Sequence, residues 1–129
     1  MKRVRILMAD DHTEMLKRAV CLLQSEFEVV GAVNDGQALL EAASKLRPDV
    51  VVLDISMPVM NGLEAADRLR EVGSRAKVVF LTVHENPDFV HESLAHGALG
   101  YVIKPRLTSD LVPAIKEALA NRSFVSPLP

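Results

Sequence analysis

Short apolar runs and longer segments of helical periodicity alternate along the chain. The apolar runs, which are rich in β-branched residues, are residues 4–9, 27–33, 50–53, 78–81 and 101–103. Between and after them apolar side chains recur at helical spacing, which predicts five helices. Strands that alternate with helices favour parallel pairing through right-handed crossovers. The pattern therefore predicts an α/β fold, a three-layer sandwich around five parallel strands.

Two local features test this assignment. The third apolar run, residues 50–53, contains no polar residue, as expected of a strand that is buried on both faces. Pro113 falls inside the last helical segment, where proline is tolerated only in the first turn. We therefore predict that this helix begins at Thr108 or Ser109.

Composition and charge narrow the class of protein. A chain of 129 residues suits one domain, and 49% hydrophobic residues exclude intrinsic disorder. The formal net charge is -2 and no Lys/Arg block occurs, which disfavours direct nucleic-acid binding. The single cysteine, Cys21, excludes a disulfide framework and a Cys-rich zinc site. It lies near the apolar face of the first helix, so we expect a small core side chain there.

Targeting signals are not evident in the sequence. The apolar runs are too short to cross a membrane, and the basic start is followed by only four apolar residues before an aspartate pair. A soluble, cytoplasmic protein is the expectation, with no membrane partner.

Polar residues follow four of the predicted strands. Asp10 and Asp11 follow the first, Asp54 the third, Thr82 the fourth and Lys104 the fifth. Because the carboxyl ends of parallel strands meet at one edge of the sheet, these side chains should converge there. Each residue alone is most often a turn former, a helix cap or a solvated side chain, so the prediction depends on their joint occurrence.

The charges of this group favour a bound cation. Three clustered carboxylates repel one another, and Lys104 alone does not balance them. A hard divalent ion with oxygen ligands fits, and Mg²⁺ fits best. An aspartate beside Mg²⁺ and a lysine can attack phosphorus and form an acyl phosphate. Asp54, on the central strand, is the candidate nucleophile, and the Thr82 hydroxyl can hydrogen-bond the product.

These residues resemble the motifs of the receiver domain of bacterial two-component response regulators. The resemblance covers residues 4–122 and is carried by Asp10-Asp11, by residues 54–58 with Asn61-Gly62, by Leu81-Thr82 and by Lys104-Pro105. The residues at Asp11-His12, at 54–58 and at 62–66 are similar to the motifs of the LuxR/NarL-type branch of this family. The resemblance implies a CheY-like, flavodoxin-like (βα)5 fold with strand order 2-1-3-4-5.

The resemblance also implies how the site works. A sensor histidine kinase would donate a phosphoryl group to Asp54 in a Mg²⁺-dependent reaction. Asp11, Asp54 and the backbone carbonyl of Ser56 would bind the metal directly, and Asp10 through a water. Lys104 would contact the phosphoryl group.

The same resemblance assigns further residues to the conformational switch and to the control of the phosphoryl lifetime. Thr82 and Tyr101 would form the switch pair, with the aromatic ring turned inward in the active state. The bond between Lys104 and Pro105 would be cis, as only X-Pro bonds adopt cis cheaply. Ser56 and His84 are candidates for tuning the phosphoryl lifetime, although His84 is equally well a surface imidazole without a role.

His12 follows the acidic pair directly. We expect it to be a helix-start residue rather than a metal ligand.

Rival functions fit the residues less well. An aspartyl-phosphate phosphatase of the haloacid dehalogenase type needs a second aspartate where Ser56 stands. A flavin or nucleotide carrier on this fold needs a Gly/Ser/Thr-rich first loop, whereas this chain has Asp10-Asp11-His12 there. A pseudo-receiver or a stand-alone receiver that acts by docking a partner protein stays as the alternative. No enzyme activity is expected beyond the domain's own phosphorylation and dephosphorylation.

The domain boundary follows from the tail. Residues 1–122 are expected to form the receiver domain, and residues 123–129, with two prolines, the start of an interdomain linker. A C-terminal helix-turn-helix, not present in these residues, would then control transcription, and DNA would be bound only through it. We expect a phosphorylation-dependent homodimer, formed through either the fourth helix, fifth strand and fifth helix or the first and fifth helices.

Overall fold

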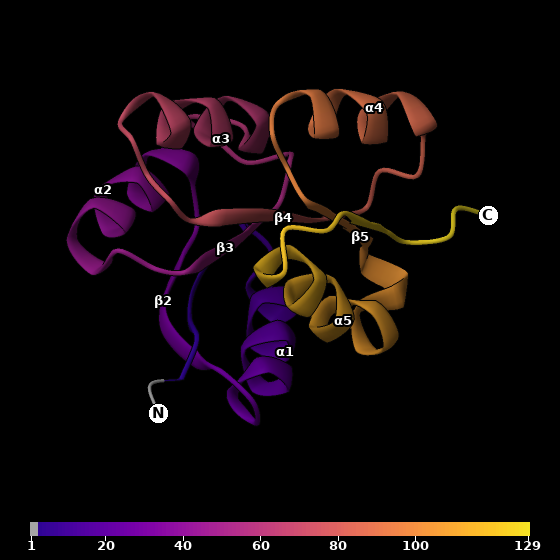
Figure 1. Ribbon diagram of the computed structural model, residues 1–129, viewed down its shortest axis with the longest axis horizontal. Helices are drawn as coiled ribbons and strands as arrows, with labels where there is room; N and C mark the ends of the chain where they lie inside the picture. The colour runs from indigo at the N-terminus through magenta and orange to yellow at the C-terminus, as the bar shows by residue number, and fades with distance from the viewer. Residues whose placement is uncertain (1–2) are drawn as a thin grey trace.

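The computed structural model describes residues 3–129, so the first two residues of the predicted domain lie outside the described part. Strands and helices alternate along the chain (Figure 1). Their order is β1 (Arg5–Ala9), α1 (Thr13–Gln24), β2 (Glu28–Val33), α2 (Gly36–Leu46), β3 (Val50–Leu53), α3 (Gly62–Glu71), β4 (Lys77–Thr82), α4 (Pro87–Ala95), β5 (Gly100–Ile103), the 3-10 turn η1 (Lys104–Arg106), α5 (Leu107–Leu119) and β6 (Phe124–Val125). The five predicted strands and five predicted helices are all present.

The sheet is parallel throughout and has the order β2-β1-β3-β4-β5-β6. The expected order 2-1-3-4-5 is therefore confirmed, and one strand is added at its edge. That sixth strand, Phe124–Val125, lies in the tail that we expected only to open a linker. Two apolar residues between serines, with prolines following, carry too little pattern to predict a strand.

Helices cover both faces of the sheet and bury two apolar layers (Figure 1). One layer lies under α2, α3 and α4, and the other under α1 and α5. β3 passes between them: Val51 and Leu53 belong to the first layer, Val50 and Val52 to the second. All four side chains are buried, which confirms the prediction made from this run.

The start of the last helix was predicted wrongly. α5 begins at Leu107, directly after η1, and Pro113 lies in its interior. The helix continues through the proline because its inner face is buried against the sheet. That burial offsets the lost backbone hydrogen bond. The buried residues of this face are Leu107, Asp110, Leu111, Ala114, Ile115 and Ala118.

The prediction for Cys21 was also wrong, since its side chain is exposed. The buried residues of α1 are Leu16, Ala19 and Leu23. Cys21 lies two positions from both Ala19 and Leu23, which is a rotation of about 200° around the helix. It therefore lies on the outer side, where it lines a shallow surface hollow between α1 and α5.

The loops that lead into the helices are shaped by side-chain caps and one close approach. Asp35 and Asn61 cap α2 and α3 by accepting hydrogen bonds from Ala38 N (2.8 Å) and Glu64 N (2.9 Å). A Cβ atom at Gly62 would lie 2.2 Å from the carbonyl oxygen of Asp54. Only glycine therefore lets α3 begin against the end of β3, which brings the loop of residues 55–61 over Asp54.

Within residues 3–129, no helix combines the length and the apolar composition that crossing a membrane would require.

Candidate functional site

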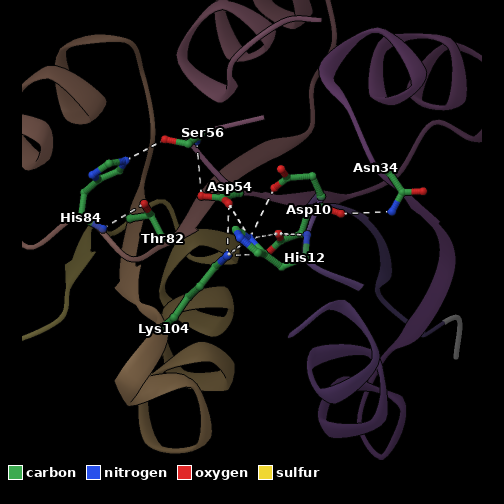
Figure 2. Close-up of polar contacts among 9 residues, drawn as sticks. Asp10, His12, Asn34, Asp54, Ser56, Thr82, His84 and Lys104 are labelled. Carbon is green, nitrogen blue, oxygen red and sulfur yellow. Dashed lines mark hydrogen bonds and ion pairs between the residues drawn. The ribbon is translucent and has the colours of Figure 1, made fainter. Parts of the chain in front are cut away.

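The carboxyl ends of four strands bring the predicted residues together, as expected (Figure 2). Asp10 follows β1, Asp54 follows β3, Thr82 ends β4 and Lys104 follows β5. These four polar side chains are buried, at 3%, 1%, 0% and 6% exposure respectively. Such burial is costly unless charges are paired, so the charged members of this group must compensate one another.

Lys104 supplies the compensating positive charge. Its Nζ lies 3.1 Å from Asp54 Oδ2 and 2.9 Å from Asp10 Oδ2. Burial lowers the pKa of Lys104, but its hydrogen bonds and its attraction to both carboxylates outweigh that effect and raise it. The lysine therefore stays charged between the two aspartates.

Asp54 has a raised pKa. Burial is the main cause and Asp10 adds to it, while the attraction and hydrogen bond of Lys104 oppose it. The Ser56 amide also approaches Oδ1 at 3.4 Å. Asp54 is thus a buried carboxylate whose charge depends on a cation beside it.

The acidic cluster suits a hard divalent cation. Ligand atoms of Asp10, Asp11, His12 and Asp54 all lie within 4.8 Å of one another. Among the described residues, Oδ2 of Asp10 is a buried oxygen without a hydrogen-bond donor of suitable geometry, despite the ion pair with Lys104. Carboxylate oxygens are the ligands that Mg²⁺ prefers, so the donor set fits this ion.

His12 stands at the start of α1, as predicted. Its side chain does not cap the helix, and its Nδ1 instead lies 3.2 Å from Asp10 Oδ1 and 3.4 Å from Asp11 Oδ1. This proximity was not expected from a helix-start residue. The ring lies over the carboxylates and is largely exposed.

Thr82 and Tyr101 both hydrogen-bond to the backbone of His84. Thr82 Oγ1 accepts a hydrogen bond from His84 N (3.2 Å), and Tyr101 Oη donates one to His84 O (2.7 Å). The Tyr101 side chain is turned inward and fully buried. Burial, with a contribution from the charge of Asp54, raises its pKa to about 12.

The loops after β3 and β4 meet above Asp54 (Figure 2). Ser56 Oγ and His84 Nε2 are 2.7 Å apart. The His84 ring is stacked on Phe89 of α4, with centroids 4.2 Å apart and planes 11° apart. His84 is therefore held by contacts on two sides. The contact of His84 with Phe89 was not predicted from the sequence, where the only signal for Phe89 is its place in the apolar pattern of α4.

The prediction of a cis bond before Pro105 is wrong, because the described residues contain no cis peptide bond. Pro105 is the middle residue of η1, a turn that runs directly into α5. A trans bond is the lower-energy form of X-Pro and suits this path of the chain.

Two polar groups near the site were not found from the sequence. Asn34 donates from Nδ2 to the Asp10 carbonyl (3.2 Å). Asp110, in the first turn of α5, is buried and accepts hydrogen bonds from Arg106, Ser109 and Ser126. Buried acidic residues in a helix carry no periodic signal, so only the fold reveals Asp110.

The chain is thus an α/β domain with a parallel sheet and a buried Asp–Lys cluster at the carboxyl edge of that sheet. Residues 6–116 match the response regulator receiver domain family. The chain therefore belongs to the receiver domains of two-component response regulators, which are signalling domains.

Relatives and solved structures agree with this family. The chain is 38% identical to the nitrate/nitrite response regulator protein NarL of Escherichia coli K12, over 94% of this chain and 57% of that protein. It is 34% identical to the transcriptional regulatory protein DegU of Brevibacillus brevis, over 97% of this chain and 54% of that protein. The chain thus spans a little over half of these relatives.

The fold is likewise that of receiver domains. The signal receiver domain of the putative regulator NarL from Mycobacterium tuberculosis superimposes with a TM-score of 0.89 at 31% identity, covering 95% of this chain and all of that one. The isolated receiver domain of RcsB from Salmonella enterica, in the presence of phosphomimetic BeF3-, gives 0.87 at 25% identity, over 96% of this chain and 94% of that one. The family resemblance, the fold and the receiver function predicted from the sequence are confirmed.

Proposed function

We propose that Asp54 accepts a phosphoryl group from a sensor histidine kinase in a Mg²⁺-dependent reaction, and that the resulting acyl phosphate switches the domain to control an output. The observation that carries this proposal is the buried ammonium of Lys104, 3.1 Å from Asp54 and 2.9 Å from Asp10. A nucleophile and a fixed positive charge at this distance suit in-line transfer of an anionic group.

In the transfer, a carboxylate oxygen of Asp54 forms a bond to phosphorus. The bond between phosphorus and the imidazole nitrogen of the kinase breaks, and the imidazole keeps the electron pair. Lys104 stabilises the charge on the phosphoryl oxygens and exchanges part of its contact with Asp54 for them. Burial raises the pKa of Asp54, and the positive charge of Lys104 opposes that rise and so favours the ionised, nucleophilic form.

Asp11, Asp54 and the backbone carbonyl of Ser56 would hold Mg²⁺ directly, and Asp10 would hold it through a water. When bound, this ion supplies positive charge that neutralises the phosphoryl oxygens. Asp10 Oδ2 is buried and faces Lys104 in an ion pair without receiving a hydrogen bond of good geometry, which supports a role for that carboxylate as an acceptor within the site.

Thr82 and Tyr101 form the switch pair in this proposal. The Thr82 hydroxyl now accepts from His84 N, and it can turn to donate to a phosphoryl oxygen. Tyr101 is already inward and donates to His84 O. Both side chains are thus tied to one residue, His84, so a change at the hydroxyl reaches the phenol through a single loop.

Ser56 and His84 tune the phosphoryl lifetime in the same proposal. Their 2.7 Å contact spans the space above Asp54 and would hinder a water that approaches the acyl phosphate. The stacking on Phe89 supports this role, because it keeps the imidazole in place.

The output belongs to the proposal as well. Relatives are named transcriptional regulatory proteins, which supports control of transcription through a helix-turn-helix beyond these residues, with DNA bound there. We propose that residues 1–122 form the receiver, that residues 123–129 begin the linker, and that phosphorylation produces a homodimer. We also propose that the protein is cytoplasmic. Its catalysis would be limited to its own phosphorylation and dephosphorylation. A stand-alone receiver remains the alternative.

Acetyl phosphate and Mg²⁺ test the acceptor directly. Intact mass should show one phosphoryl group on the wild-type chain and none on Asp54→Asn. Asp88→Asn, which changes an exposed carboxylate at the start of α4, is the matched control and should be phosphorylated normally. Phosphorylation of Asp54→Asn at the wild-type rate would show that the acceptor is another residue. Light scattering on the same samples reports the dimer.

A further inference from the structure

The tail after α5 occupies the outer edge of the sheet. Phe124–Val125 forms β6, parallel to β5, with Tyr101 opposite Val125. Phe124 N donates to Leu99 O and Ser126 N to Tyr101 O, each at 2.8 Å. In Figure 1 this yellow segment runs along β5 between α4 and α5. Strand β5, which carries the proposed switch residue Tyr101, is therefore hydrogen-bonded on one side to the chain's own tail.

Apolar side chains hold the tail on both faces of the sheet. Phe124 packs against the layer under α1 and α5, and Leu128 against the layer under α2, α3 and α4. Tyr101 belongs to the layer under α2, α3 and α4. The tail thus straddles the edge of β5 and borders the layer that contains the switch ring.

A buried polar cluster fastens this strand. Ser126 is 1% exposed and Asp110 is 4% exposed. Ser126 Oγ donates to Asp110 Oδ2 (2.7 Å) and accepts from Ile103 N (3.3 Å). Asp110 also accepts from Arg106 Nε (2.7 Å) and from Ser109 Oγ (2.9 Å). Both oxygens of this carboxylate therefore have donors, which a buried charge requires.

The protonation state of Asp110 is consistent with such a cluster. Burial alone would raise the pKa of Asp110, but the hydrogen bonds from Arg106, Ser126 and Ser109 outweigh it and lower the pKa. The carboxylate is charged, so each of its bonds is charge-assisted and stronger than a neutral one.

The cluster is hydrogen-bonded to residues at both ends of η1, the turn that carries Lys104. Ile103, whose amide donates to Ser126, immediately precedes Lys104, and Arg106 is the last residue of η1. Covering a free strand edge would need only the backbone bonds of β6. It would not need a buried serine whose hydroxyl joins the residue before Lys104 to a charged aspartate.

We propose that Ser126 and Asp110 form a latch that ties strand β6 to the turn of Lys104, so that docking of the tail and occupation of the phosphoryl site stabilise each other. Both are positioning residues, acting through Lys104 and Tyr101. The proposal rests on the proposed function, and it identifies the contacts through which phosphorylation of Asp54 would affect the tail that follows α5. Because coupling is reciprocal, a tail that favours the occupied site must itself be held more firmly when the site is occupied.

The test uses the full chain with beryllofluoride and Mg²⁺, a combination that mimics the phosphoryl group without a covalent bond. Ser126→Ala breaks the latch, Ser126→Thr keeps the hydroxyl, and Ser123→Ala makes the matched change at an exposed serine of the same tail. Binding is followed by fluorine NMR, and docking of the tail by hydrogen exchange at the Ser126 amide.

In the wild-type chain, beryllofluoride should slow exchange at the Ser126 amide at least about fivefold, the lower range of allosteric coupling. Ser126→Ala should bind beryllofluoride at least about fivefold more weakly than Ser123→Ala, and Ser126→Thr should recover part of the loss. Equal affinities of Ser126→Ala and Ser123→Ala, with binding intact, would mean that the tail merely covers the edge.

The wild-type exchange measurement needs no variant, so it decides the question even if Ser126→Ala fails to fold. Unchanged exchange in a chain that binds beryllofluoride overturns the latch and leaves the proposed function standing. Absence of beryllofluoride binding by the wild-type chain overturns the proposed function, and the latch with it.

Discussion

Tyr101 is the only tyrosine of the chain, and the chain has no tryptophan, so its phenol can be titrated without interference. Its side chain is fully buried and its hydroxyl donates to His84 O at 2.7 Å. Burial, with help from the charge of Asp54, raises its pKa from 10.0 to about 12. We therefore expect phenolate absorbance to appear at a pH about two units higher in the folded chain than in the chain unfolded in urea.

The same difference is a statement about stability. Between pH 10 and pH 12 the folded chain keeps the phenolic proton, whereas the unfolded chain loses it. The contribution is thus fully present below pH 10 and is lost as the pH rises toward 12. Its size is about 3 kcal/mol, from about 1.4 kcal/mol for each tenfold change in the proton equilibrium.

Two variants make the measurement specific. The unfolding free energy of the wild type should fall relative to Tyr101→Phe between pH 10 and pH 12, since the phenylalanine variant lacks the titrating group. Asp54→Asn should lower the pKa of Tyr101, because it removes a nearby negative charge. Circular dichroism confirms that the chain is still folded. A phenol that titrates near pH 10 in the folded chain would refute the buried, hydrogen-bonded ring.

Three further changes test the site and the helix that follows it. Lys104→Met leaves Asp10 and Asp54 buried without a counter-charge, so the unfolding free energy at pH 7 in EDTA should fall by about 3 kcal/mol while Mg²⁺ affinity holds or rises; wild-type stability in urea unfolding would contradict this. Asp11→Ala should weaken Mg²⁺ binding, measured by calorimetric titration, more than Asp10→Ala does, because only Asp11 is proposed as a direct ligand; equal affinities would exclude these roles. Pro113→Ala should raise the unfolding free energy by about 1–3 kcal/mol, since alanine restores a backbone donor inside α5; an unchanged thermal midpoint would contradict it.

Much of the site follows from the sequence because its residues stand at strand ends. Once the alternation of elements predicts a parallel sheet, Asp10, Asp54, Thr82 and Lys104 must approach one edge. Their identity was therefore accessible without coordinates, and the structure buries all four together. The family motifs added roles that strand ends alone do not specify, such as those of Ser56.

The rotamers and close contacts around this site required the tertiary structure. Whether Tyr101 points inward depends on how β4, β5 and α4 pack, and the contact of Ser56 with His84 joins residues 28 positions apart. The trans bond before Pro105 depends on the path of η1 into α5. A local pattern carries none of this information.

The sequence by itself determined the element order, the buried central strand and the composition of the Asp–Lys cluster, because hydrophobic periodicity is local and the topology it implies brings strand ends together. Only the tertiary structure decided that the tail is a sixth strand, that Cys21 faces outward, and that Ser126 meets Asp110. The physical reason is that a two-residue strand or a single turn of helix is too short to show a hydrophobic period from which its position could be predicted. Their positions depend on which distant backbone donors and apolar surfaces the rest of the fold leaves available to them.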